Sequence, residues 1–199
     1  MKVLITGFEP FGGEAVNPSE EVVKALPDSI GDREIVKQIL PTVFEKGSKT
    51  LIAALEKHQP DLLLCVGQAG GRSGITPERV AINLRDASIP DNEGNEPSDE
   101  PIIPQGEAAY FSTLPIKEMV KAVKDLALPA TVSNTAGTFV CNEVMYTALH
   151  YAKTCCPHLK AGFVHIPYTE SQVRNKPEST PFFKEEDILR AMIAMIRVL

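Results

Sequence analysis

The chain has 199 residues, of which 43% are hydrophobic and 23% are charged, and its net charge is −6. This length suits one compact domain, so we expect residues 1–199 to form a single domain. The acidic balance and the absence of any basic run argue against a nucleic acid or an anionic membrane surface as partner.

Short apolar runs alternate along the chain with segments of helical periodicity, beginning at the N-terminus, where we expect a strand and not a signal peptide. Asn17 and Pro18 form a typical helix start, with a capping side chain followed by proline. The alternation predicts a three-layer α/β/α sandwich of the phosphorylase/hydrolase type, with a twisted, largely parallel (mixed) sheet. The expected strands are 2–8, 34–41, 61–67, 79–84, 129–134 and 161–167, and the expected helices are 17–26, 44–58, 115–128, 142–154 and 185–199.

Two segments between these elements are candidate site loops. Residues 67–74, "GQAGGRSG", follow an expected strand but match neither a phosphate loop nor a dinucleotide fingerprint. Because α/β sheets bind ligands at the carboxyl ends of their strands, we expect a site loop that holds no nucleotide. Residues 87–109 are rich in proline, glycine and acids, and a loop of this length is typically functional or mobile.

The four cysteines form no CxxC pair, which is typical of a protein from a reducing compartment. Cys65 lies inside an apolar run, where a free cysteine packs as a small hydrophobe. Cys155 and Cys156 end an expected helix, and no second cysteine pair exists to complete a tetrahedral metal site with them. We expect no chemistry from these three.

Cys141 differs because turn-forming residues meet a helical pattern at its position, in "SNTAGTFVCNEVMY" (133–146). A helix N-terminus stabilises an anion, so a thiol in this place can have its pKa lowered from the usual value of about 8.5. The same N–H groups could hold the oxyanion of an acyl-transfer intermediate. The alternative at this stage is a buried turn cysteine.

A nucleophilic thiol needs a base and a group that orients the base. His165 is the best placed of the four histidines because it lies near the end of the expected strand 161–167, although a core histidine is the alternative. Glu78 follows the glycine-rich loop and could orient the imidazole. Spacing alone does not choose it over Glu143 or Asp86.

Four blocks of the sequence belong together: "GFEPFGGEAVNPSE" (7–20), "GQAGGRSGITPERVAIN" (67–83), "SNTAGTFVCNEVMY" (133–146) and "GFVHIPY" (162–168). In this order they resemble one family, the pyrrolidone-carboxylate peptidases (pyroglutamyl peptidases type I), which are cysteine peptidases. The resemblance runs nearly end to end, and it implies a catalytic triad of Glu78, Cys141 and His165. It also implies removal of an N-terminal pyroglutamyl (5-oxoproline) residue from peptides through a thioester, with no metal or cofactor, by a cytoplasmic homodimer or homotetramer.

The resemblance also implies an apolar slot for the lactam ring. Such a slot would reject an ordinary N-terminus, because its ammonium would lose its hydration. Gln68 and Asn17 would either bond to the substrate or brace the loops. The residues implied for the slot are Phe8, Phe11, Phe139 and Val140, with Thr42 and Ile89 nearby.

One position departs from the family pattern. The chain reads "DASIPDN" where many relatives read "DARIPDN", so Ser88 stands in place of a common arginine, and Arg85 is a candidate substitute. Two other functions stay open from the sequence. One is a different acyl-transfer or phosphorolytic enzyme on a similar fold, and the other is a non-catalytic protein that keeps the ring pocket.

Overall fold

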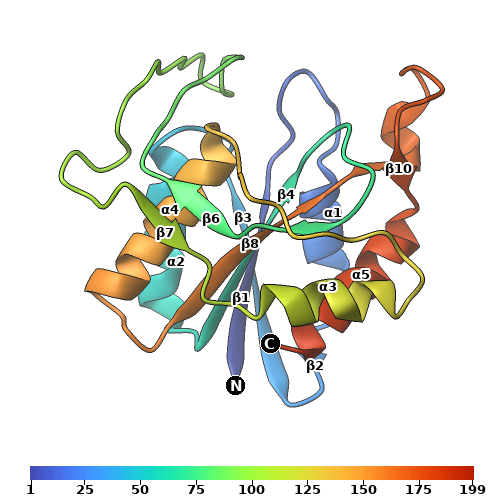
Figure 1. Ribbon diagram of the computed structural model, residues 1–199, viewed down its shortest axis with the longest axis horizontal. Coiled ribbons are helices and arrows are strands. Elements are labelled where there is room, and N and C mark those ends of the chain that lie inside the picture. The colour runs from blue at the N-terminus through green and yellow to red at the C-terminus, as the bar shows by residue number, and fades with distance from the viewer.

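A six-stranded sheet forms the centre of the computed structural model, which describes residues 1–199 (Figure 1). Four central strands run parallel, and a short antiparallel strand flanks them at each edge. The prediction of a largely parallel but mixed sheet is therefore confirmed. The strand order is β2 (Ser29–Ile30), β3 (Arg33–Leu40), β1 (Lys2–Phe8), β4 (Leu62–Gln68), β8 (Lys160–Ile166) and β5 (Thr76–Pro77).

Helices cover both faces of the sheet, which Figure 1 shows nearly edge-on between them. Each face has its own buried apolar cluster, so the three-layer α/β/α sandwich is confirmed. No helix combines the length and the apolar character that crossing a membrane requires. On one face lie α2 (Lys46–His58) and α4 (Val140–Thr154), and on the other lie α1 (Pro18–Ala25), α3 (Ile116–Lys124) and α5 (Glu185–Arg197).

The central strand β4 is buried along its whole length, as expected for a parallel strand covered on both faces. Its side chains alternate between the layers: Leu64 packs in the α1/α3/α5 cluster, and Cys65 packs in the α2/α4 cluster. The prediction that Cys65 is a buried packing residue is confirmed. On this same α4 side, β4 presents Gly67, which becomes important at the site.

The prediction of a strand over residues 129–134 is wrong. The segment makes only two isolated bridges, from Ala130 to Ile75 and from Ser133 to Glu78. Its neighbour β5 is two residues long, which leaves little strand edge for pairing. The expected strand 79–84 shortens to β6 (Val80–Ile82), which pairs outside the main sheet with β7 (Ala109–Phe111). The remaining elements are β9 (Tyr168–Thr169), the 3₁₀ helix η1 (Glu170–Val173) and β10 (Phe182–Phe183).

The long loop 87–109 contains no helix or strand until β7 begins at Ala109, and Asp91 anchors it. The Asp91 carboxylate is buried and accepts the backbone N–H groups of Phe44, Glu93 and Asn95. Burial raises the pKa of this carboxyl, but the hydrogen bonds outweigh burial and hold the pKa below its usual value. The loop is thereby tied to the segment that leads into α2.

Candidate functional site

His165 and Glu78 meet at the carboxyl end of the parallel strands. His165 lies near the end of β8, and Glu78 directly follows β5, the antiparallel neighbour of β8. The imidazole Nδ1 is 2.7 Å from the Glu78 Oε1, and both residues are buried, with 4% and 0% of their surfaces exposed. The carboxylate that contacts His165 is therefore Glu78, the first of the three acids that the sequence left open.

Cys141 approaches the same place from α4. A Cβ atom added to Gly67 would stand 2.9 Å from the Cys141 Sγ and 2.7 Å from the Phe163 Cζ, so the sulfur packs where only glycine leaves room. Gly67 lies opposite His165 in the pairing of β4 with β8. The Phe163 ring is itself 4.8 Å from the His165 ring. The fold thus brings Cys141 to the strand position next to His165.

The start of α4 supplies free hydrogen-bond donors. Cys141 is the second residue of the helix, after the N-cap Phe139 and Val140. The N–H groups of Asn142 and Glu143 donate to the Phe139 carbonyl, at 3.0 and 3.2 Å. Those of Val140 and Cys141 bond to no backbone carbonyl. Two unpaired N–H groups at the positive end of a helix dipole suit a developing oxyanion.

The predicted lowering of the Cys141 pKa is wrong. Burial, reinforced by the Glu78 charge, raises the pKa of the thiol to about 12, and the helix start does not offset this. Burial also lowers the pKa of His165, although the Glu78 carboxylate opposes that shift. Both shifts favour a neutral thiol beside a neutral imidazole. This pair needs proton transfer before the sulfur can attack.

Arg72, which the sequence reasoning missed, is the second partner of Glu78. Its Nη1 lies 2.6 Å from the Glu78 Oε1 and 2.6 Å from the Thr76 Oγ1, and its Nη2 donates to the Thr135 carbonyl at 3.1 Å. Burial raises the pKa of Glu78, but His165, Ser133 and Arg72 together bring it below its usual value. The available signal was a lone basic residue inside "GQAGGRSG".

Aromatic side chains gather beside the start of α4. The Phe139 ring lies 6.0 Å from the Phe11 ring and 5.2 Å from the Phe44 ring, which it meets edge to face. Phe44 was missed by the sequence reasoning, although it comes two residues after Thr42. Ile89 reaches the same loop as Phe11, with its Cδ1 4.0 Å from the Cβ position of Gly12.

Two other predicted slot residues lie in the core. Phe8 is buried, with its ring 6.1 Å from that of Phe163. The Val140 side chain is buried and packs against α2, with its Cγ1 3.5 Å from the Cβ position of Gly47. Only the backbone N–H group of Val140 is therefore available to a substrate.

Of the predicted polar residues, Asn17 and Thr42 brace a loop, and Gln68 has a free hydrogen-bond donor. Asn17 caps α1 as expected, and its Nδ2 donates to the Glu9 carbonyl at 3.1 Å. Thr42 donates to the same carbonyl at 2.8 Å, so both residues brace the loop that carries Phe11. The Gln68 Oε1 accepts from Gln172 at 2.9 Å, while the Gln68 Nε2 has no acceptor in the protein.

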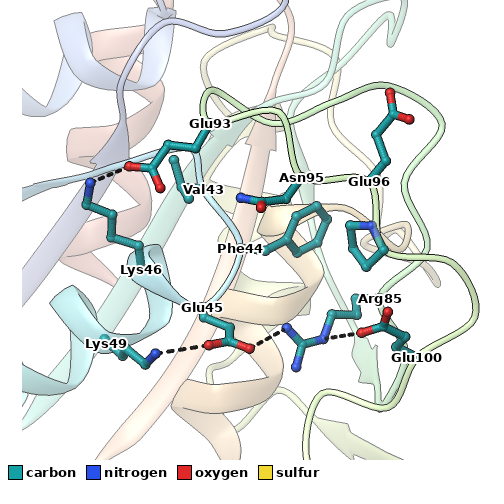
Figure 2. A pocket seen from close by; sticks show the side chains of 11 residues that line it. Val43, Phe44, Glu45, Lys46, Lys49, Arg85, Glu93, Asn95, Glu96 and Glu100 are labelled. Carbon is teal, nitrogen blue, oxygen red and sulfur yellow. Dashed lines mark hydrogen bonds and ion pairs between the residues drawn. The ribbon is translucent and has the colours of Figure 1, made fainter.

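Arg85, the candidate substitute for the common family arginine, lies among carboxylates. It lines a hollow of about 620 Å³, where its Nη1 is 3.2 Å from Glu45 and its Nε is 3.9 Å from Glu100 (Figure 2). Its Nη1 also lies 3.7 Å from the Glu143 Oε2. Ser88 is exposed and makes no side-chain hydrogen bond. The carboxylates of Glu45, Glu100 and Glu143 therefore surround the Arg85 guanidinium, and the substitution for the family arginine stays a prediction.

The two rejected acids have other partners. Glu143 accepts the Glu45 N–H at 2.6 Å and the Ser48 hydroxyl at 3.0 Å, which caps the start of α2 from outside. Asp86 accepts the Asp99 N–H at 3.2 Å. No three His, Cys, Asp or Glu side chains converge in an arrangement that could hold a metal ion.

The chain is similar to known proteins along its whole length. The family model described as pyroglutamyl peptidase matches residues 1–199. A pyrrolidone-carboxylate peptidase of Streptococcus pyogenes serotype M4 is 58% identical over 98% of this chain and 91% of its own.

Solved structures agree with this assignment. The crystal structure of pyroglutamyl peptidase I from Bacillus amyloliquefaciens matches with a TM-score of 0.96 at 50% identity, over 99% of this chain and 95% of that one. A mutant pyrrolidone carboxyl peptidase from the hyperthermophile Pyrococcus furiosus matches with a TM-score of 0.96 at 45% identity, over 100% and 97% of the two chains. With the match of the family model to residues 1–199, these findings show that the chain belongs to the pyroglutamyl peptidase family.

Proposed function

We propose that this protein is a cysteine exopeptidase that removes an N-terminal pyroglutamyl residue from peptides, with Cys141, His165 and Glu78 as its triad. Family membership supports the activity. One observation carries the residue roles. The Glu78–His165 pair lies opposite Gly67, on which the Cys141 sulfur packs, at a helix start with two free N–H groups.

The reaction begins with general-base catalysis, because burial keeps the thiol protonated. His165 takes the proton from the Cys141 Sγ, and the sulfur attacks the pyroglutamyl carbonyl carbon. The N–H groups of Val140 and Cys141 hold the resulting oxyanion. One such donor is worth about 3–4 kcal/mol of transition-state stabilisation. Glu78 stabilises the imidazolium that forms and holds the ring in the orientation that directs its Nε2 to the sulfur.

Collapse of the tetrahedral intermediate breaks the bond between carbon and nitrogen. His165 gives its proton to the leaving amine, which leaves a thioester on Cys141. His165 then takes a proton from water, and the hydroxide attacks the thioester. The Cys141 sulfur departs, and free pyroglutamate is released with the thiol restored.

Specificity for the lactam follows from the slot between the loop of Phe11 and the start of α4. Phe11, Phe139 and Ile89 offer apolar surface to a flat, uncharged ring. The Gln68 Nε2 is the free donor among the predicted polar residues and is a candidate for the lactam carbonyl. A site that pairs the lactam polar atoms rejects proline, which lacks the carbonyl and carries a charged nitrogen.

We further infer that residues 1–199 act as one catalytic domain, without a metal or cofactor. The family resemblance supports a cytoplasmic location and a homodimer or homotetramer. Light scattering after size-exclusion chromatography tests the oligomeric state, and a single protein mass equal to one chain would contradict it.

The activity is tested with a pyroglutamyl-coumarin amide beside its prolyl analogue, in reducing buffer, with and without iodoacetamide. We expect turnover of the pyroglutamyl substrate alone and its loss on alkylation. A phosphate requirement would favour the phosphorolytic alternative. Binding of pyroglutamate without turnover would favour the non-catalytic one.

A further inference from the structure

We propose that Arg72 is a positioning residue, which holds Glu78 for His165 and ties this pair to the turn before Cys141. The inference rests on the proposed triad. Arg72 leaves the glycine-rich loop after Gly71, whose φ of +86° suits glycine. Its guanidinium then bonds to Glu78 through Nη1 and to the Thr135 carbonyl through Nη2.

Arg72 supplies the permanent charge that Glu78 needs. The Glu78 carboxylate is fully buried, and its ion pairs are with Arg72 at 2.6 Å and His165 at 2.7 Å. The imidazole is neutral in the resting site, because burial lowers its pKa. A buried carboxylate facing only a neutral group would be driven towards protonation. Arg72 therefore keeps Glu78 ionised in the interval before His165 becomes charged.

Arg72 also connects the acid side of the site to the cysteine side. Its Nη2 donates to Thr135, in the turn that leads to the N-cap Phe139. The same turn is fixed to the backbone beside Glu78, because the Arg79 N–H donates to the Ser133 carbonyl at 2.8 Å. The Arg72 guanidinium thus bonds to both the Glu78 carboxylate and this turn.

The direction of the pH effect follows from the titratable groups that the Arg72 charge acts on, which are Glu78, His165 and Cys141. The positive charge lowers the pKa of Glu78, of His165 and of Cys141. Loss of the charge therefore raises all three values. Turnover requires an ionised Glu78 and a neutral His165, so both changes move the acid limb of kcat/KM to higher pH.

The test compares Arg72→Gln and Arg72→Lys with Arg79→Gln as a matched control. Arg79 follows Glu78 directly and bonds to Asn134 in the same turn at 2.8 Å, but forms no ion pair with Glu78. For Arg72→Gln we expect kcat/KM to fall roughly tenfold to hundredfold, mainly through kcat, with the acid limb at higher pH. Arg79→Gln is expected to keep the wild-type profile.

Arg72→Lys separates the charge from the bridge. A lysine keeps a cation beside Glu78 but cannot also reach the Thr135 carbonyl. We expect the wild-type acid limb with a reduced kcat. If Arg72→Gln does not fold, as circular dichroism would reveal, an unchanged kcat in Arg72→Lys overturns the proposal by itself.

The proposal is overturned if folded Arg72→Gln has the same acid limb of kcat/KM as wild type. It is also overturned if the acid limb of Arg79→Gln shifts as far as that of Arg72→Gln. Failure of the proposed activity is a distinct result, because the wild type would then show no pyroglutamyl turnover.

The role of Arg72 is still tested in that case by the rate of Cys141 alkylation with iodoacetamide, read by peptide mass spectrometry across pH. We expect slower alkylation in Arg72→Gln, and equal rates overturn the proposal.

Discussion

Two buried glutamates, each facing an arginine, behave in opposite ways. Glu78 is 0% exposed and lies 2.6 Å from Arg72, and its pKa is below the usual value. Glu143 is 2% exposed and lies 3.7 Å from Arg85, and burial keeps its pKa above the usual value despite that arginine. Burial alone therefore does not decide the charge of a carboxyl group. The balance between burial and the hydrogen bonds and charges of its neighbours decides it.

The two regions also do different work. In the first region, Arg72 keeps the Glu78 carboxylate ionised beside His165, the proposed base for the Cys141 thiol. Glu143 caps the start of α2, directly beside Phe44, whose ring contacts Phe139. Changes in the first region should lower kcat, whereas changes around the second should alter substrate binding and stability.

Between the two regions, the largest expected difference is that between Glu78→Gln and Glu143→Gln. The amide keeps the size of Glu78 but removes the charge that stabilises the imidazolium. We expect kcat to fall by roughly 10³–10⁴, the scale of an acid-to-amide change in a triad. Glu143→Gln preserves an acceptor for the cap, and its kcat should stay near wild type. Steady-state kinetics on both variants checks this, and equal losses would erase the distinction between the two acids.

Phe139→Ala is expected to have the next largest effect, and this effect is on substrate binding. Removing the ring opens the slot next to Phe11, and an aromatic contact is worth about 0.5–1.5 kcal/mol. We expect KM for the pyroglutamyl substrate to rise roughly twofold to tenfold with kcat nearly retained. Phe111→Ala serves as the control because that ring is 67% exposed on β7. An unchanged KM in Phe139→Ala removes Phe139 from the slot.

The smallest expected effect is on stability, and its sign differs between the two acids. A raised folded pKa makes the Glu143 contribution complete below its unfolded pKa, and it is lost as pH rises through the folded value. Glu143→Gln should therefore be as stable as wild type at pH 7, or more stable by about 1 kcal/mol.

Glu78 contributes in the opposite direction. Its lowered folded pKa gives stability above the unfolded pKa that is lost as pH falls through the folded value. Glu78→Gln should be less stable than wild type at pH 7, with a difference that shrinks below about pH 4. Calorimetric Tm values of both variants across pH provide the comparison. A larger loss at pH 7 in Glu143→Gln than in Glu78→Gln would contradict it.

The sequence predicted the layers and most elements because apolar periodicity records which faces are buried. It failed for 129–134, where the short edge strand β5 offers too little partner. It also predicted that Cys141 lies at a helix start. It gave the wrong sign for the thiol pKa, because the close packing of the sulfur on Gly67 is a tertiary contact that local spacing cannot show.

The choice of the acid that contacts His165 shows the same limit of local sequence patterns. Glu78, Glu143 and Asp86 are alike in sequence, and only the fold places one of them on His165. Arg72 and Phe44 went unnoticed because their partners lie in other segments of the chain. The catalytic roles of Cys141, His165 and Glu78 stay predictions until variants are assayed.

The most direct test of the account is turnover of a pyroglutamyl-coumarin amide by purified Cys141→Ser, beside a Cys155→Ser/Cys156→Ser control. All three changes replace sulfur by oxygen, but only Cys141 packs on Gly67 next to His165. The account predicts no detectable turnover in a folded Cys141→Ser and wild-type turnover in the control. Appreciable turnover by Cys141→Ser would contradict the assignment of Cys141 as the nucleophile.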